Sequence, residues 1–304
     1  MVMPAYGSGA QPTVWQPVNL DELQALKNEL SGKYCYAAGA TLLRTQWEGG
    51  LVPVPEHMIS LARIPGASGV YVDGDDLVIG AVTRLSHCAT DILLQQLPIL
   101  QSAMNAIAAP SIRNMATIGG NIVSGVGDSI PALLVYDAQL YWMTDNGMEM
   151  RSLSSWLNGG REGSRNPNDV LIAIHIPMKH TPFLDVASER TFVTREISFY
   201  RKLGRRETFT ASLVTIAFHG ELGADDRWNK IAIAAGGGSG MAMRLTESEQ
   251  LLLGVEASVM QASSLAATVM AEFETYSDVF ATEQYRKQTA GNMLGAGLWE
   301  ALRL

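Results

Sequence analysis

Apolar and polar positions alternate in recognisable periods along most of the chain. Asn19 followed by Glu22 is a capping-box pattern, which predicts the start of a helix. The leucines that follow fall on one helical face, at Leu23, Leu26 and Leu30. A glycine two residues later ends this pattern, so we expect a short amphipathic helix near the N-terminus.

Short apolar runs between turn residues predict strands. In the first part of the chain we expect them over residues 34–37, 58–61, 77–81, 133–142 and 170–176. Asp145-Asn146-Gly147 is typical of a hairpin turn. Between residues 93 and 108 the apolar positions recur at helical spacing, and we expect Pro110 to end that helix.

The second part of the chain has its own strands and helices. Residues 178–195 are polar and irregular, and we interpret them as a domain boundary. Beyond them we expect strands over residues 209–218 and 230–235, a turn at 236–238, and helices over 246–253 and 257–275. The pattern is that of an α+β protein.

Composition narrows the function classes. The chain has 304 residues, 47% of them hydrophobic, and a net charge of −8, which argues against nucleic-acid binding and against binding to anionic membranes. Its two cysteines, Cys35 and Cys88, form no metal-ligand pattern, so we expect buried thiols in a reducing compartment. With no signal-peptide pattern and no apolar stretch long enough to span a membrane, we expect a soluble, cytoplasmic protein.

The most informative motif is a cluster of glycines. It consists of Thr117, Ile118, Gly119, Gly120 and Asn121, followed by Gly125, Gly127 and Asp128. Such a turn lets backbone N–H groups approach an anion, so it resembles half of a diphosphate cradle. A second loop could supply the other half; it follows the strand at 34–37 and consists of Ala38, Gly39, Ala40, Thr41, Leu42 and Leu43.

Other sequence motifs are absent or allow more than one interpretation. No GxGxxG, Walker A, GxSxG or HExxH pattern occurs. The basic cluster at residues 200–206 is either a solvated loop before a strand or a group of cations facing a cofactor, with Lys202 as the candidate. Asp128 is either a simple turn residue or a carboxylate that grips a ribose hydroxyl.

The glycine cluster lies within a longer pattern that resembles a known family. Residues 112–122 read I-R-N-M-A-T-I-G-G-N-I, and residues 131–138 read P-A-L-L-V-Y-D-A. Both are similar to the FAD-binding medium subunit of the molybdenum hydroxylases, which include xanthine dehydrogenase, aldehyde oxidoreductase and CO dehydrogenase. The first loop resembles the family's A-G-G-T-D-L-L but departs from it at Ala38, Ala40 and Thr41.

The resemblance implies a fold and a division into domains. We expect a two-lobed FAD-binding domain of the PCMH (vanillyl-alcohol-oxidase-like) type over residues 1–178, with lobes of 1–62 and 63–178. A C-terminal α+β domain of the CO dehydrogenase flavoprotein type is expected over residues 188–304. The residues that the resemblance assigns to FAD are Ala37, Ala38, Gly39, Ala40, Thr41, Leu42, Ile107, Thr117, Ile118, Gly119, Gly120, Asn121, Asp128, Leu171 and Lys202.

The resemblance also implies a function and partners. The chain would be one part of a heterotrimer, passing electrons from [2Fe–2S] clusters of a small subunit through FAD to NAD⁺ or another acceptor. A large subunit would carry the molybdopterin cofactor. Two alternatives stay open at this point: a self-sufficient FAD-dependent oxidase or reductase of the same fold, and a nucleotide-binding module without redox chemistry.

Overall fold

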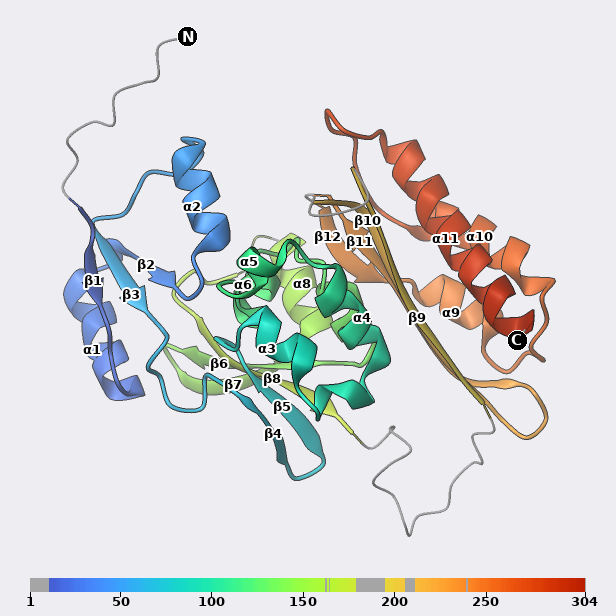
Figure 1. Ribbon diagram of the computed structural model, residues 1–304, viewed down its shortest axis with the longest axis horizontal. Helices are drawn as coiled ribbons and strands as arrows, with labels where there is room; N and C mark the ends of the chain where they lie inside the picture. Colours follow the sequence, from blue (N-terminus) through green and yellow to red (C-terminus); the bar gives the residue numbers. More distant parts are fainter. Residues whose placement is uncertain are drawn as a thin grey trace.

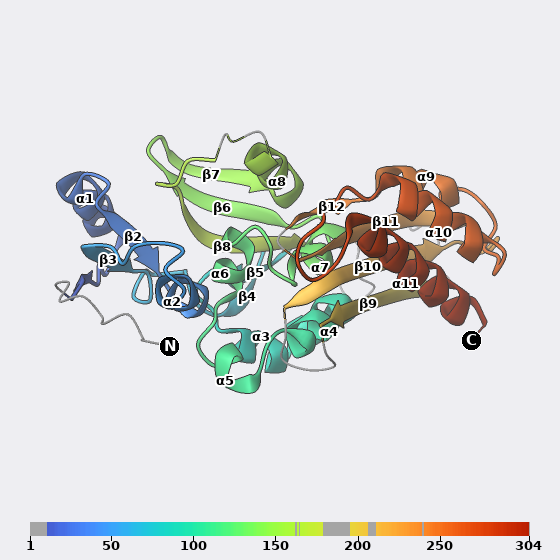
Figure 2. The same ribbon diagram turned by 90° about the horizontal axis from the view of Figure 1, so that it is seen from above.

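The computed structural model describes residues 11–161, 163, 165–178, 195–205, 211–238 and 240–303. Their strands form three sheets that follow one another along the long axis of the molecule (Figures 1 and 2). The N-terminal sheet, in the first lobe, lies at one end, and the C-terminal sheet lies at the other. In the described part of the chain no helix has the length and apolar character that crossing a membrane requires.

The first sheet is small and parallel. It contains β1 (Thr13–Trp15), β3 (His57–Ser60) and β2 (Tyr34–Ala37), in that order. The predicted capping residue is confirmed, because Asn19 accepts a hydrogen bond from the Glu22 amide at the start of α1 (Leu20–Leu30). The helix α2 (Thr41–Glu48) lies between β2 and β3 in the chain and has no buried residue.

The second sheet, in the second lobe, is antiparallel and carries most of the helices. Its strands follow the order β4 (Val70–Asp73), β5 (Asp76–Gly80), β8 (Val170–Pro177), β6 (Gln139–Thr144) and β7 (Gly147–Ser152). The helical segments between β5 and β8 are α3 (Leu85–Thr90), η1 (Leu94–Gln96), α4 (Pro98–Ala106), α5 (Pro110–Arg113), α6 (Ile118–Val123), α7 (Ile130–Val135) and α8 (Leu153–Arg161).

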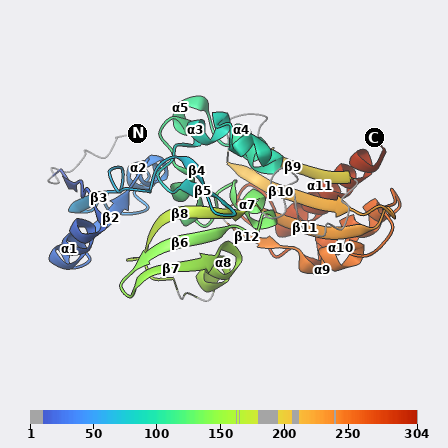
Figure 3. The same ribbon diagram turned by 90° about the horizontal axis from the view of Figure 1, so that it is seen from below.

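The third sheet is antiparallel and is covered on both faces. Its strands follow the order β12 (Gly240–Arg244), β11 (Trp228–Gly237), β10 (Ser212–Leu222) and β9 (Arg195–Gly204). The outer helices are α9 (Thr246–Leu252), α10 (Gln261–Glu272) and α11 (Glu283–Arg303). On the other face α4 and α7 pack against the sheet (Figure 3), and alanines of β10 and β11 share one core with the second sheet's helices.

Some expected elements differ in the structure. The strand predicted over residues 133–142 is wrong in its first half, because α7 is buried on every side and therefore shows no amphipathic period. The helix predicted over 93–108 begins only at Pro98 and ends before Ile107, while Pro110 starts the next helix instead of ending this one. The basic cluster lies in strand β9 as far as Gly204. Most of the boundary segment, residues 179–194, lies outside the described residues.

Candidate functional site

A cleft of about 680 Å³ lies where the first and second lobes meet. The loop between β2 and α2 forms one wall, and the segments around α5 and α6 form the other. Near one end the cleft also reaches Ser212 and Gly238 of the third sheet. The cleft is largely apolar, which is typical of sites that bury a ring-containing ligand.

Most of the predicted site residues line this cleft. They are Ala38, Gly39, Ala40, Thr41, Leu42, Ile107, Thr117, Gly119, Gly120, Asn121, Asp128 and Leu171. The exceptions are Ala37, which ends β2; Ile118, whose side chain is fully buried in the core; and Lys202, which contacts Asp128 from β9. The two glycine loops, far apart in the sequence, therefore face the same space.

The first loop supplies a continuous run of free backbone donors. Within the described residues, no amide from Ala38 to Leu43 donates to a protein acceptor. Ala40 has a φ of 51°, so the chain turns through the left-handed region just before α2 begins. Successive N–H groups in such a turn point toward one side and form an anion-binding concavity.

Gly39 is required for the contact between the lobes. A Cβ atom there would lie 2.1 Å from the Met115 carbonyl oxygen, because the two backbones pass directly over each other. The loop therefore keeps a glycine where the opposite wall leaves no room for a side chain. Alanines occupy the flanking positions, Ala38 and Ala40.

In the second loop, most amides donate hydrogen bonds to other groups of the protein. The Ile118 and Gly119 amides donate to the carbonyls of Thr83 and Ala81, at 3.0 and 2.8 Å. The sequence singled out this loop as the most informative motif and as one half of the cradle; in the structure these two amides fix α6 against the second sheet. Sequence alone could not show this, because the acceptors belong to a distant segment that only the fold brings alongside α6.

The two glycines of α6 have different roles. A Cβ on Gly119 would lie 2.5 Å from the Ala81 carbonyl oxygen, so this glycine is needed for packing. Gly120 is exposed to the cleft, and a Cβ there would meet only the Thr117 hydroxyl oxygen at 3.1 Å. Gly120 is therefore the position at which an added side chain would enter the cleft.

Asp128 joins the cleft to the third sheet. Its carboxylate accepts a hydrogen bond from the Ser212 hydroxyl at 2.5 Å and pairs with Lys202 Nζ at 2.8 Å. The Tyr200 hydroxyl donates to the Asp128 carbonyl oxygen at 2.9 Å. Burial, with Asp128 nearby, raises the pKa of Tyr200 well above its usual value, so this phenol stays a neutral donor.

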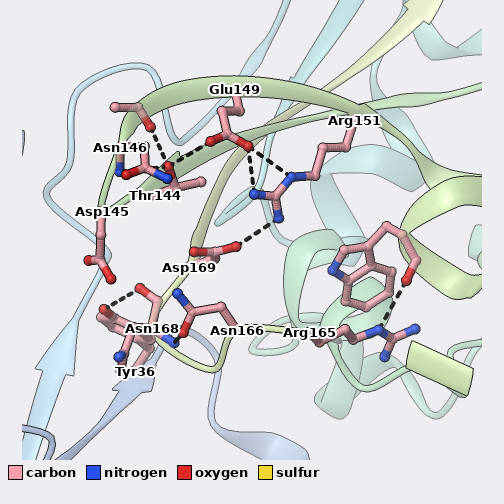
Figure 4. A network of polar contacts seen from close by, with 12 residues as sticks. Tyr36, Thr144, Asp145, Asn146, Glu149, Arg151, Arg165, Asn166, Asn168 and Asp169 are labelled. Carbon is pink, nitrogen blue, oxygen red and sulfur yellow. Dashed lines mark hydrogen bonds and ion pairs between the residues drawn. The ribbon is translucent and has the colours of Figure 1, made fainter. Parts of the chain in front are cut away.

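A network of polar side chains joins the first and second lobes beside the cleft (Figure 4). The Tyr36 hydroxyl donates to the Asn168 carbonyl oxygen at 3.0 Å, while Arg151 pairs with Glu149 and with Asp169. This network borders a second, polar hollow of about 850 Å³. Asp169 lines both spaces, so the network forms a wall between the hollow and the cleft.

Sequence reasoning missed several residues of the cleft. Examples are Tyr36, Gln46, Ala108, Ile112, Ser212 and Gly238. Tyr36 belongs to a strand that was predicted, and strand alternation could have placed it toward the second lobe. No local signal marks Ser212 or Gly238, because only the packing of the third sheet brings them to the cleft.

Comparison with known proteins identifies the family. Residues 8–179 match the FAD binding domain in molybdopterin dehydrogenase, and residues 198–301 match the CO dehydrogenase flavoprotein C-terminal domain. The chain belongs to the molybdopterin dehydrogenase FAD-binding family. It thus carries an FAD-binding domain, and the resemblance seen in the sequence is confirmed, as is the α+β fold.

Two of the similar proteins are subunits of oxidoreductases. The carbon monoxide dehydrogenase medium chain of Afipia carboxidovorans is 35% identical over 130 residues, which cover 42% of this chain and 45% of that one; the match thus spans less than half of that relative. The xanthine dehydrogenase FAD-binding subunit of Escherichia coli O157:H7 is 24% identical over 250 residues, 81% of each chain.

A solved structure supports the same assignment over nearly the whole chain. The chain superimposes on a chain of carbon monoxide dehydrogenase from Hydrogenophaga pseudoflava with a TM-score of 0.84 and 25% sequence identity. The superposition covers 96% of this chain and 98% of that one. The structural likeness therefore extends over all three sheets.

Proposed function

We propose that this chain binds one FAD non-covalently in the cleft and passes electrons from [2Fe–2S] clusters of a partner subunit to NAD⁺ or another acceptor. The observation that carries the proposal is the run of amides from Ala38 to Leu43 without protein acceptors among the described residues, which faces an apolar cleft between two lobes. A ligand that is anionic in its middle and aromatic at its ends, as FAD is, matches this distribution.

Individual residues fit the parts of FAD. The amides around Ala40 would bind the diphosphate, with the Thr117 hydroxyl and Gly120 on the opposite wall. Ile107 and Leu171 line the cleft with apolar surface suited to a flat ring. Neither glycine loop contains a histidine or cysteine that could form a covalent flavin link.

FAD would supply the redox chemistry, and the chain would bind it, orient it and exclude water. Lys202 adds a positive charge that is almost buried beside Asp128, at the end of the cleft nearest the third sheet. The chain's two cysteines cannot provide the four thiolate ligands of a [2Fe–2S] cluster. We therefore assign the clusters to a small subunit and the molybdopterin cofactor to a large one.

The first test is the identity of the cofactor. The protein is purified with whatever subunits accompany it and is denatured, and the released flavin is separated by chromatography. Intact FAD in about equimolar amount is expected. Recovery of FMN alone, or a well-folded complex with no flavin, would contradict the proposal.

The second test separates electron transfer from substrate oxidation. The co-purified complex is depleted of FAD and then mixed with the substrate that the intact complex oxidises. The substrate should still reduce the iron–sulfur centres, while delivery of electrons to the acceptor should stop and return when FAD is added back. Undiminished delivery without FAD, or substrate oxidation by the isolated chain, would exclude a role as an electron conduit and favour a self-sufficient enzyme.

A further inference from the structure

The segment between α4 and α5 has an unusual backbone. Ile107 caps the C-terminal end of α4, and the next residue, Ala108, has a φ of 47°. This left-handed region is disfavoured for an L-residue that carries a side chain. Such outliers persist where their surroundings hold them, and they concentrate at ligand sites. Both Ile107 and Ala108 line the cleft.

Two cations hold the carbonyl groups of this segment. Arg113 Nη1 donates to the carbonyl oxygens of Ile107 and Ala108 at 2.9 and 2.6 Å. Lys202 Nζ donates to the Ala106 carbonyl oxygen at 3.0 Å. Among the described residues, Arg113 has no carboxylate partner, so its charge is directed at the backbone.

Holding the carbonyls also fixes the direction of the amides. In a trans peptide the C=O group and the following N–H group point in opposite directions. With the Ile107 and Ala108 carbonyls turned toward Arg113, the Ala108 and Ala109 amides face away from it. Arg113 does not line the cleft, whereas Ala108 does, and neither amide has an acceptor within the described residues.

The Ala108 and Ala109 amides lie near the end of the cleft where we expect the flavin ring of FAD. Ala106 lies against Lys202 of β9, whereas the far end of the same wall, at Met115, lies against Gly39 of the first loop. The Ala108 and Ala109 amides are therefore toward the end of the cleft nearest the third sheet, away from the free amides around Ala40. The ring of FAD carries carbonyl oxygens and ring nitrogens that accept hydrogen bonds.

We infer that Arg113 is a positioning residue, which turns the Ala108 and Ala109 amides into the cleft as a donor pair for the flavin ring. The inference rests on the proposed function, since it assumes that FAD occupies the cleft. Donors fixed in advance stabilise negative charge on a bound group without reorganising. The pair would thus strengthen FAD binding and raise the reduction potential of the bound flavin.

The test compares variants of the full chain, purified with its partner subunits and reconstituted with FAD. Arg113→Met removes the donors but keeps an extended side chain, while Arg113→Lys keeps an ammonium that can reach carbonyl oxygens. Arg84→Met is the matched control, because Arg84 is an exposed arginine near the cleft whose side chain has no partner among the described residues. FAD affinity, the midpoint potential and the flavin absorption spectrum are measured for each.

Arg113→Met should weaken FAD binding about tenfold, corresponding to the loss of one or two hydrogen bonds. Its midpoint potential should be lower and its absorption bands shifted. Arg113→Lys should recover part of both changes, and Arg84→Met should match the wild type.

A second substitution removes one amide directly. Ala109 has a φ of −77°, which lies in the range of proline, so Ala109→Pro deletes its amide donor without requiring a new φ at this residue. If Arg113 acts by aiming this amide, the double variant should lose less FAD affinity than the two single variants combined. Strictly additive losses would contradict the positioning role, because they would show that Arg113 and the Ala109 amide act independently.

The two hypotheses fail in different ways. A wild-type chain that takes up no FAD would overturn the proposed function and this inference with it. A wild-type chain that binds FAD, beside an Arg113→Met chain of equal affinity, potential and spectrum, would overturn only the inference. If Arg113→Met did not fold, Arg113→Lys together with Ala109→Pro would decide, and an unchanged potential and spectrum in both would exclude the donor pair.

Discussion

Lys202 and Asp128 form an ion pair of 2.8 Å between strand β9 and the loop that follows α6. Their side chains are 11% and 12% exposed, so the pair is largely removed from water. Lys202 also holds the Ala106 carbonyl, and Asp128 also accepts from Ser212. The third sheet thereby fixes the position of two separate segments of the cleft wall.

Breaking this pair should cost stability. Asp128→Asn or Lys202→Met leaves one charge without its partner in a largely buried position, which we expect to lower the free energy of unfolding by about 2–4 kcal/mol. The double variant should lose less than the sum of the two, because neither charge is then left alone. Urea denaturation of the three variants measures this coupling, and a double variant that loses the full sum would show that the two side chains are uncoupled.

The two glycines of α6 should respond in opposite ways to alanine. Gly119→Ala places a Cβ against the Ala81 carbonyl and should destabilise the fold by about 1–3 kcal/mol. Gly120→Ala adds helix propensity, worth up to about 1 kcal/mol, and should leave stability unchanged or raised while weakening FAD binding. Thermal unfolding without FAD and titration with FAD distinguish the two. Equal FAD affinity in Gly120→Ala and the wild type would remove this position from the binding wall.

Ala40 offers a test of the first loop. Proline cannot adopt its φ of 51° and has no amide, so Ala40→Pro should abolish FAD binding. Glycine adopts this φ freely and keeps the amide, so Ala40→Gly should retain binding. The measurement is flavin content after purification under identical conditions. Normal FAD content in Ala40→Pro would place the diphosphate elsewhere.

His219 should make stability depend on pH. Burial opposes its protonation, but Glu196 and Glu221 outweigh burial and raise the pKa of the imidazole above its ordinary value, although Lys230 acts against them. Its Nε2 lies 3.1 Å from Glu221, and its Nδ1 lies 3.3 Å from Glu196 as an ion pair without hydrogen-bond alignment.

The direction of the pH dependence follows from linkage. Because the folded pKa is raised, the stabilisation is fully present below the unfolded pKa of about 6.5 and is lost as the pH rises through the folded value. Unfolding free energies measured from about pH 5.5 to about pH 8.5 should therefore contain a decrease that His219→Gln removes. A His219→Gln profile parallel to that of the wild type would exclude this contribution.

The elements that the sequence predicted correctly depend on local signals. The capping box at Asn19, the strand at Tyr34–Ala37 and the hairpin at Asn146 depend on neighbouring residues, and all three are present. The motifs also identified both loops of the cleft, because glycine patterns are local as well.

What the sequence could not predict depends on distant partners. The amides of Ile118 and Gly119 are already paired with the 81–83 segment, so these two amides are not free to bind a diphosphate. Asp128 pairs with Lys202, which is distant in the chain. The sequence assigned Asp128 to the ribose and Lys202 to the flavin, and it gave no sign that the two side chains contact each other.

Helix α2 has no buried residue, although Leu42, Leu43 and Gln46 line the cleft. A ligand in the cleft would therefore supply apolar contacts that most other described helices receive from their own chain. With FAD bound, part of this lobe's core would be a molecule that the gene does not encode. Amide exchange over residues 38–48 would then report how much of a preparation carries its cofactor, and selection on Leu42 would act through the shape of FAD rather than through the fold.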